Sequence, residues 1–318
     1  MRFPKLQSQA LGALFLAAAL AAQQPPVPPG AGGEGRGPGE GRGGGGRGRG
    51  QLGGQAAGFV VNPVIDTVAP EIPADLKPGG ILIFSKTSGF REEAAIQASD
   101  VALAVIAKTH NWPYFITENG AVMNAEQLSK FKLVVWNNTS GDSLNDAQKA
   151  AFQTWVENGG SVLGTHGAGG DPVAFPAPRT VATWKWFIDT LLGAQFTSHS
   201  AIMPGDAHVV DTKSPISKGL PAVMHRADEW YAFTESVSKK PGYHVLITAD
   251  EKSYTPGRAT MGEDHPLAWW HCVGKGHVVY SALGHGGMMY AETPLIQLYE
   301  NAMAWGLAEH GHACPAGK

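Results

Sequence analysis

A histidine in a glycine-rich turn is the strongest chemical signal in this chain. Residues 162–171 read VLGTHGAGGD. Within them, residues 164–168 (GTHGA) have the preceding strand, the small residues and the tight turn of a nucleophile elbow, G-x-S-x-G, with His166 in place of the serine. This histidine excludes the usual acyl-enzyme chemistry at the position. Because open α/β folds bind ligands at the carboxyl edge of the sheet, we predict that the turn presents His166 to a functional site there.

Two other glycine-rich signatures do not fit the same residues. A dinucleotide fingerprint, G-x-G-x-x-G, must open a helix, but the residues after Gly170 are rich in proline. A phosphate loop requires Gly-Lys-Ser/Thr, which does not follow the turn. The turn is therefore expected to present a side chain rather than to hold a phosphate.

Histidines and carboxylates elsewhere in the chain could join His166 at that edge. We predict that loops at the strand ends bring four of them to it: His199, Asp228, Glu229 and His285. Acid/base catalysis would use His166 and His285 with one of the two carboxylates, because imidazole exchanges protons near neutral pH. Alternatively, His166, His199 and His285 would bind a divalent metal such as zinc. Spacing alone leaves both chemistries open.

Candidate substrate contacts lie in the same loops. Arg91 follows the first predicted strand, where it could hold a substrate oxygen or only form a salt bridge. Aromatic rings suit a carbohydrate, because the apolar faces of sugars stack on them. Core packing is the other explanation for such rings, and His265, before Pro266, is equally well a strand-end residue. The predicted substrate-binding residues are Arg91, His199, His265, Trp230, Tyr231 and Asp171.

Alternating strand and helix patterns must position these side chains. A continuous apolar run at 81–84 predicts a strand buried on both faces, and the mostly apolar stretches 132–136 and 161–164 predict two further strands. Helical spacing predicts a helix over about 92–110 and another over about 143–159. Buried strands that alternate with amphipathic helices are typical of a parallel α/β sheet.

The second half of the chain has more strands and fewer helices. Strands are expected at 243–249, 267–273 and 277–283, and the last two are joined by a short turn. The fold class predicted is therefore α/β, a three-layer sandwich with a mostly parallel mixed sheet.

Local signals also mark the helix ends. Residues 143–146 (SLND) resemble a capping box with Asp in place of Glu, and Gly159 is placed to stop that helix. A final helix is expected to begin with Thr293 as its cap and Pro294 in its first turn.

The N-terminal residues have the composition of export and tether segments. Residues 1–22 contain basic residues, an apolar run too short to span a bilayer and an Ala-Leu-Ala site, which predicts a signal peptide cleaved near Ala21. The expected location is therefore periplasmic or secreted. Residues 23–78 are rich in Gly, Pro and Arg and are expected to form a disordered linker. The folded domain is expected at 79–310, followed by a flexible tail at 311–318.

Composition and cysteine content limit the classes of partner. A formal net charge of -3 with 43% hydrophobic residues gives no electrostatic reason for a nucleic-acid partner. The two cysteines, Cys272 and Cys314, suit an oxidising compartment, and the sequence leaves open whether they pair.

Seven ordered blocks of the sequence carry a family resemblance. The blocks are 84–91 (FSKTSGFR), 136–142 (WNNTSGD), 164–172 (GTHGAGGDP), 192–196 (LGAQF) with His199, 228–231 (DEWY), 264–269 (DHPLAW) and 280–285 (YSALGH). Together they resemble the trehalose-utilisation (ThuA-like) family.

This resemblance implies a class I glutamine amidotransferase-like (flavodoxin-like) fold and a role in carbohydrate metabolism around 3-keto-disaccharides, with a sugar dehydrogenase as a possible partner. Amidotransferase activity is not implied, since the elbow carries His166 instead of a cysteine. Relatives commonly have a histidine directly after Phe-Arg, where this chain has Glu92.

These observations lead to one leading hypothesis and two alternatives. We expect an exported carbohydrate-active enzyme that cleaves a sugar or keto-sugar glycoside by hydrolysis or elimination. A non-catalytic carbohydrate-binding or envelope-tethered module is the first alternative, favoured by the long linker and the missing histidine after Arg91. The second alternative is a structural domain in which the elbow is a relic and no ligand binds.

Overall fold

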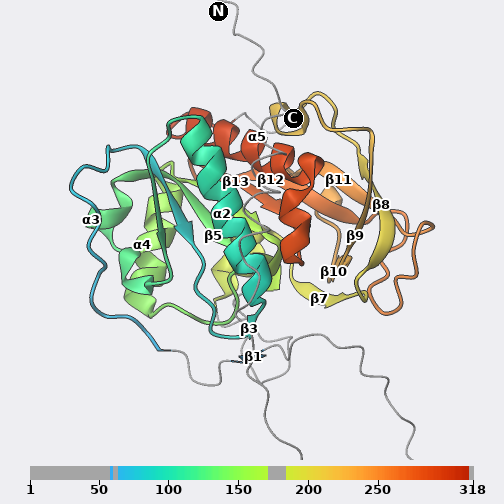
Figure 1. Cartoon of the computed structure of the whole chain (residues 1–318), viewed down its shortest axis with the longest axis horizontal. Helices are drawn as coiled ribbons and strands as arrows, with labels where there is room; N and C mark the ends of the chain where they lie inside the picture. The colour runs from blue at the N-terminus through green and yellow to red at the C-terminus, as the bar shows by residue number, and fades with distance from the viewer. Residues whose placement is uncertain (1–57, 60–63, 171–183, 315–318) are drawn as a thin grey trace, which may run out of the picture. The chain divides into compact units, whose positions relative to one another are not determined.

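The computed structural model describes residues 58–59, 64–170 and 184–314 (Figure 1). Residues 58–318 cluster as one compact unit. The signal peptide expected at 1–22, most of the linker and Asp171 lie outside the described residues. Among the helices that are described, none combines the length and the apolar character needed to cross a membrane.

A nine-stranded mixed sheet lies at the centre of this unit, in the order β4-β2-β5-β6-β13-β12-β11-β8-β9. The first five strands in that order are parallel, and the remaining pairs are antiparallel. Two short ribbons, β1–β3 and β7–β10, accompany the sheet. The strands are β1 (Gly58–Phe59), β2 (Gly80–Phe84), β3 (Phe90–Arg91), β4 (Tyr114–Thr117), β5 (Phe131–Asn137), β6 (Ser161–Thr165), β7 (Phe196–His199), β8 (Met203–Val209), β9 (Val223–Asp228), β10 (Tyr231–Phe233), β11 (His244–Asp250), β12 (Pro266–Val273) and β13 (Gly276–Ser281).

Helices cover both faces of the parallel half of the sheet. Leu133 of β5 lies against Gly306 of α5, whereas Trp136 of the same strand packs edge-on against Phe152 of α4, with ring centroids 5.1 Å apart. Side chains an odd number of positions apart in a strand point to opposite faces, so α5 and α4 lie on opposite sides. Helix α2 contacts α5 and runs beside it (Figure 1). The three-layer α/β sandwich is therefore confirmed.

The described helices are of three types. The α-helices are α2 (Glu93–Thr109), α3 (Ala125–Leu128), α4 (Asp146–Glu157) and α5 (Thr293–Glu309). One π-helical segment, η3 (Phe187–Leu192), lies between β6 and β7. The 3-10 segments are η1 (Gly120–Val122), η2 (His166–Gly170), η4 (Pro215–Ser217), η5 (Val237–Lys239) and η6 (Gly287–Ala291).

Two helix caps differ from the prediction. Helix α4 is capped by Asn145, whose side chain accepts from Gln148 N while the Gln148 side chain accepts from Asn145 N. Gln148 lies three residues after Asn145 and returns the hydrogen bond, whereas Asp146, three residues after Ser143, has a shorter side chain than the Glu or Gln of a capping box. At the other end of the chain, Glu292 occupies the N-cap of α5, and Thr293 is its first helical residue.

The ordered domain begins before residue 79. Asp66 accepts from Gly120 N at 2.8 Å and pairs with Lys86, and its backbone carbonyl accepts from Gln148 at 2.6 Å. Ile72 is buried. These contacts hold residues 64–78 on the domain, so the predicted linker boundary at 78 is too late for this stretch. This stretch is ordered because side chains of the domain bind its backbone carbonyls: Gln148 donates to Asp66 O, and Gln127 donates to Pro70 O.

The C-terminal tail is also anchored. Cys314 forms a disulfide with Cys272 of β12, with the two Cα atoms 6.1 Å apart. Gly311 N donates to Gly159 O at 3.2 Å. The tail is thus attached as far as Cys314, and residues 315–318 lie outside the described part.

Candidate functional site

The turn after β6 has the geometry of an elbow. His166 follows Thr165, the last residue of β6, and has φ 36°, which is rare for a residue with a side chain. The Tyr280 hydroxyl holds this turn by donating to His166 O at 2.9 Å. A Cβ atom on Gly169 would lie 1.9 Å from that hydroxyl, so glycine is required where the turn passes the tyrosine. The strained conformation is stabilised by its neighbours and displays the imidazole at the carboxyl end of β6.

Three of the predicted side chains converge at this point. His166 Nε2 lies 3.1 Å from His285 Nδ1, and His285 Nδ1 lies 3.0 Å from Glu229 Oε2. The third separation, His166 Nε2 to Glu229 Oε2, is 3.8 Å. Residues from three distant parts of the chain therefore share one centre, which we call the His–Glu–His centre (His166, Glu229 and His285).

Curvature of the sheet brings Glu229 to the histidines. Glu229 follows β9, which is four strands away from β13 in the sheet order. A flat sheet would separate β9 from β13 by about 19 Å. Nevertheless Asp228, the last residue of β9, accepts from Gly284 N at 2.8 Å, only three residues after β13. The antiparallel half must curve back toward the elbow.

Asp228 stabilises the backbone around the His–Glu–His centre. Its carboxylate is fully buried and pairs with Arg226 Nη2 at 3.0 Å. It also accepts from the backbone N–H groups of Gly284, His285 and Glu229, at 2.8, 3.1 and 3.0 Å. These two adjacent residues therefore have different roles: the carboxylate of Asp228 binds backbone N–H groups, and that of Glu229 faces the histidines.

A hydrogen bond to a backbone carbonyl shows which ring nitrogen of His166 carries the proton. His166 Nδ1 lies 2.6 Å from Ala282 O, and a carbonyl only accepts, so Nδ1 carries the proton and the lone pair of Nε2 faces the centre. Burial lowers the pKa of His166 to about 4, although Asp228 and Glu229 oppose the shift. The imidazole of His166 is therefore neutral at pH 7.

His285 and Glu229 shift each other's pKa in opposite directions. Burial alone would lower the pKa of His285, but the hydrogen bond and charge of Glu229 outweigh it and raise the pKa above its ordinary value. Burial would likewise raise the pKa of Glu229, but its hydrogen bond to His285 and the nearby His166 and His199 lower it. The centre thus contains a carboxylate, a readily protonated imidazole and a neutral one.

His199 and Tyr231 line the edge of the centre. His199 Nδ1 lies 3.2 Å from Glu229 Oε1 and 2.8 Å from Ser200 O, and its side chain is partly exposed. The ring of Tyr231 lies 4.3 Å from that of His166, measured between centroids. His199 therefore contacts the centre through the second oxygen of Glu229, and Tyr231 packs against the elbow imidazole.

The remaining predicted substrate contacts lie elsewhere. His265 is fully buried, with Nδ1 2.7 Å from Glu251 Oε1 and Nε2 2.7 Å from Tyr231 O. Trp230 is also fully buried and donates to Met203 O at 3.1 Å. Arg91 forms ion pairs with Glu93 and Glu118. The ring nitrogens and guanidinium of these residues are engaged within the protein.

A polar network beside the elbow was not predicted. Asp100 of α2 accepts from Ser85 Oγ at 2.6 Å and from Asn137 Nδ2 at 2.8 Å, and burial raises its pKa. Asn138 has φ 49° and donates to the Tyr290 hydroxyl at 2.8 Å. The only sequence signal was the pair of asparagines at a strand end, because a carboxylate on the inner side of a helix looks like any other helix polar residue.

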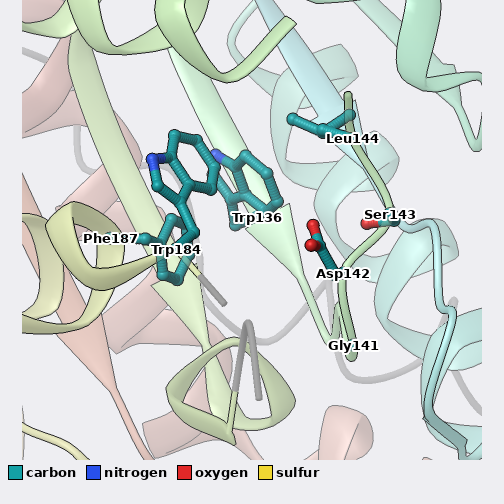
Figure 2. A pocket seen from close by; sticks show the side chains of 7 residues that line it. All are labelled: Trp136, Gly141, Asp142, Ser143, Leu144, Trp184 and Phe187. Carbon is teal, nitrogen blue, oxygen red and sulfur yellow. The ribbon is translucent and has the colours of Figure 1, made fainter. Parts of the chain in front are cut away.

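An aromatic pocket near β5 is too small for a sugar. Trp136, Trp184 and Phe187 lie close together opposite Asp142 and Ser143, as Figure 2 shows. The empty volume is about 180 Å³, below the range of about 300–1,000 Å³ typical of ligand pockets. The rings pack on one another, with Trp136 and Phe187 centroids 4.9 Å apart. These aromatic side chains therefore belong to the core.

Fold and elbow together define a class of protein. A parallel sheet between helical layers, with an elbow at its carboxyl edge, is a class I glutamine amidotransferase-like α/β fold in which a histidine occupies the elbow. The family model for ThuA, described as trehalose utilisation, matches residues 80–306. The chain belongs to the ThuA family.

Two solved structures share this fold. A ThuA-like protein from Bacteroides uniformis superposes with a TM-score of 0.62 at 24% identity, covering 78% of this chain and 99% of the other. A second ThuA-like protein, from Parabacteroides merdae, gives a TM-score of 0.55 at 20% identity over 75% of this chain and 94% of the other. No curated protein matches the chain.

Proposed function

We propose that this protein is an exported enzyme that cleaves a glycoside of a sugar or keto-sugar at the His–Glu–His centre. The observation that carries the proposal is the convergence of His166, Glu229 and His285, whose facing atoms lie 3.0 to 3.8 Å apart at the carboxyl edge of the sheet. Membership of a family described by trehalose utilisation supports a carbohydrate as the substrate class.

The centre has the groups needed for cleavage of a keto-glycoside by elimination. The lone pair of His166 Nε2 would accept the proton from the carbon between the ketone and the anomeric carbon. The C–H electron pair forms a C=C bond to the anomeric carbon while the bond to the leaving oxygen breaks. Protonated His285 would return a proton to that oxygen, so the products are an unsaturated keto-sugar and an alcohol, and no net proton is consumed. Hydrolysis would use the same two roles, with water losing the proton.

Two features support export. The Cys272–Cys314 disulfide suits an oxidising compartment, in agreement with the signal-like residues 1–22. A keto-sugar substrate has to be supplied by oxidation of a sugar hydroxyl, so we propose a sugar dehydrogenase as the partner enzyme.

The test compares His166→Ala with His225→Ala, an exposed histidine paired with Asp206 outside the centre. Purified protein is incubated with trehalose, 3-keto-trehalose and aryl 3-keto-glucosides, and the products are identified by mass spectrometry. We expect turnover to fall at least about a hundredfold in His166→Ala and to persist in His225→Ala. Melting temperatures are measured alongside, since a large loss of stability in His166→Ala would indicate a structural histidine.

A non-catalytic carbohydrate-binding module is the second candidate function. Glu92 stands where relatives commonly have a histidine, and the neighbouring Arg91 is bound by Glu93 and Glu118 instead of facing the centre. Sugar binding that survives His166→Ala, with no product from any of the probes, would favour this function over catalysis.

A further inference from the structure

The inward atoms of the His–Glu–His centre surround one point. Their separations are 3.0, 3.1 and 3.8 Å. Ligand atoms bound to one tetrahedral zinc ion, each about 2.0–2.1 Å from it, lie about 3.3 Å apart. In the plane of this triangle, the point that is equidistant from the three atoms lies about 2 Å from each of them, which is a zinc–ligand bond length. The spacing of the three donors is therefore that of a metal site.

Protons alone do not satisfy these three atoms. His166 Nε2 has a lone pair because Nδ1 donates to Ala282 O. A proton on His285 Nδ1 can point at Glu229 Oε2 or at His166 Nε2, but not well at both. One of the two acceptors then receives no hydrogen bond from within the centre. A cation among three lone pairs removes that conflict.

The side chains of His166 and Glu229 each have a second partner, and His285 is held through its backbone. Ala282 O fixes the ring of His166, and His199 Nδ1 lies 3.2 Å from the outer oxygen of Glu229. Asp228 accepts from the backbone N–H groups of both Glu229 and His285. Such outer contacts are a regular feature of metal sites, because they set the tautomer and direction of each ligand.

We propose that His166 Nε2, His285 Nδ1 and Glu229 Oε2 bind one divalent transition metal ion of the zinc type. Two imidazoles and one carboxylate form a ligand set of catalytic zinc sites, in which the fourth position stays open. The ion would supply a Lewis acid that polarises a sugar oxygen. Because the ion would occupy the lone pairs of His166 Nε2 and His285 Nδ1, this role would replace the base and acid roles proposed above for the two histidines. Only this last role depends on the proposed function; ion binding does not.

One other group of described residues has ligand spacing, namely Cys272, His277 and Cys314. Its cysteines are joined in a disulfide and provide no thiolates. This group serves as the internal control for the experiment.

The experiment measures binding of Zn²⁺ and Co²⁺ to full-length protein that has been treated with a chelator and dialysed without reductant. Calorimetry should give one equivalent of Zn²⁺, and Co²⁺ should give visible absorption bands of a low-coordinate site. His166→Ala and Glu229→Gln should each weaken Zn²⁺ binding at least about a hundredfold, whereas His277→Ala should bind like the parent protein.

Three results would overturn the inference: no Zn²⁺ binding, binding that is unchanged in His166→Ala and Glu229→Gln, or binding that is lost only in His277→Ala. The proposed function fails separately. Protein that is free of metal yet still cleaves the keto-glycoside refutes the Lewis-acid role of the ion and leaves the function standing, whereas the binding measurements decide the site. Protein that binds one ion through these residues but converts none of the sugar probes keeps the site and refutes the function.

Discussion

Removing the Asp228 carboxylate should destabilise the protein strongly, although this residue does not face the centre. Asp228→Ala removes the nearer of the two carboxylates that pair with Arg226, whose side chain is only 1% exposed, and leaves the partly exposed Glu292 at 3.4 Å. The backbone N–H groups of Gly284 and His285 lose their acceptor at the same time.

The magnitude follows from the burial of this pair. Breaking a buried ion pair by removing one partner costs about 3–5 kcal/mol, because the remaining charge is poorly compensated. Since Glu292 still pairs with Arg226, we expect a cost at the lower end of this range. In a domain of this size each kcal/mol shifts the melting temperature by about 2–4 °C. We therefore expect Asp228→Ala to melt about 6–12 °C below the parent protein.

The assay is thermal and urea unfolding followed by circular dichroism, with Asp189→Ala as the matched control. Asp189 also pairs with a basic residue, Lys185, but both side chains are exposed. Exposed pairs contribute about 0–1 kcal/mol, so the control should melt close to the parent protein.

A double variant, Arg226→Met with Asp228→Ala, checks the cause. If Asp228→Ala loses stability because the buried guanidinium of Arg226 has lost its nearest partner, the double variant should be more stable than Asp228→Ala alone. The reasoning is refuted if Asp228→Ala unfolds within about 1 kcal/mol of the parent protein, or if the second substitution recovers nothing.

Three further outcomes are expected. First, the pKa of His166 is lowered from 6.5 to about 4, so its contribution to stability is complete above pH 6.5 and is lost as the pH falls towards 4, by at most about 3 kcal/mol. The melting temperature should therefore fall less steeply with acid in His166→Ala than in the parent protein, and equal slopes would contradict this. Second, reduction of the Cys272–Cys314 disulfide, which joins residues 42 positions apart, should cost up to about 4 kcal/mol in the chain-entropy model. Cys314→Ser should melt at the temperature of the reduced protein and be insensitive to reductant. Third, Gly169→Ala should cost about 1–3 kcal/mol and lower turnover, because the added methyl group collides with the Tyr280 hydroxyl that holds the elbow. Unchanged turnover would show that the elbow tolerates this movement.

Most of the parallel half of the fold could be predicted because its signals are local, although its edge strand β4 was not predicted. Strands β2, β5 and β6 contain apolar runs, and the helices between them repeat at helical spacing. The antiparallel half was predicted incompletely. Strand β8 contains Pro204, Gly205 and Asp206, which are all depleted in strands, and it forms because β9 and β11 pair with it on either side.

The site could be predicted in part for a similar reason. The elbow is defined by five consecutive residues, so His166 was identified without coordinates. The sequence does not say which distant side chains reach it. His265 and His285 have comparable contexts, but Glu251 and the Tyr231 carbonyl bind both nitrogens of His265, whereas His285 Nδ1 faces the centre.

By itself, the sequence determined the buried strands, the amphipathic helices and the turn that displays an imidazole, since each depends on neighbours within a few residues. Only the tertiary structure decided the choice between Asp228 and Glu229. At the end of a strand, consecutive side chains point in opposite directions, so a shift of one residue separates a carboxylate that binds backbone amides from one that meets two histidines. Curvature of the antiparallel half set that direction, and no local pattern in the sequence encodes it.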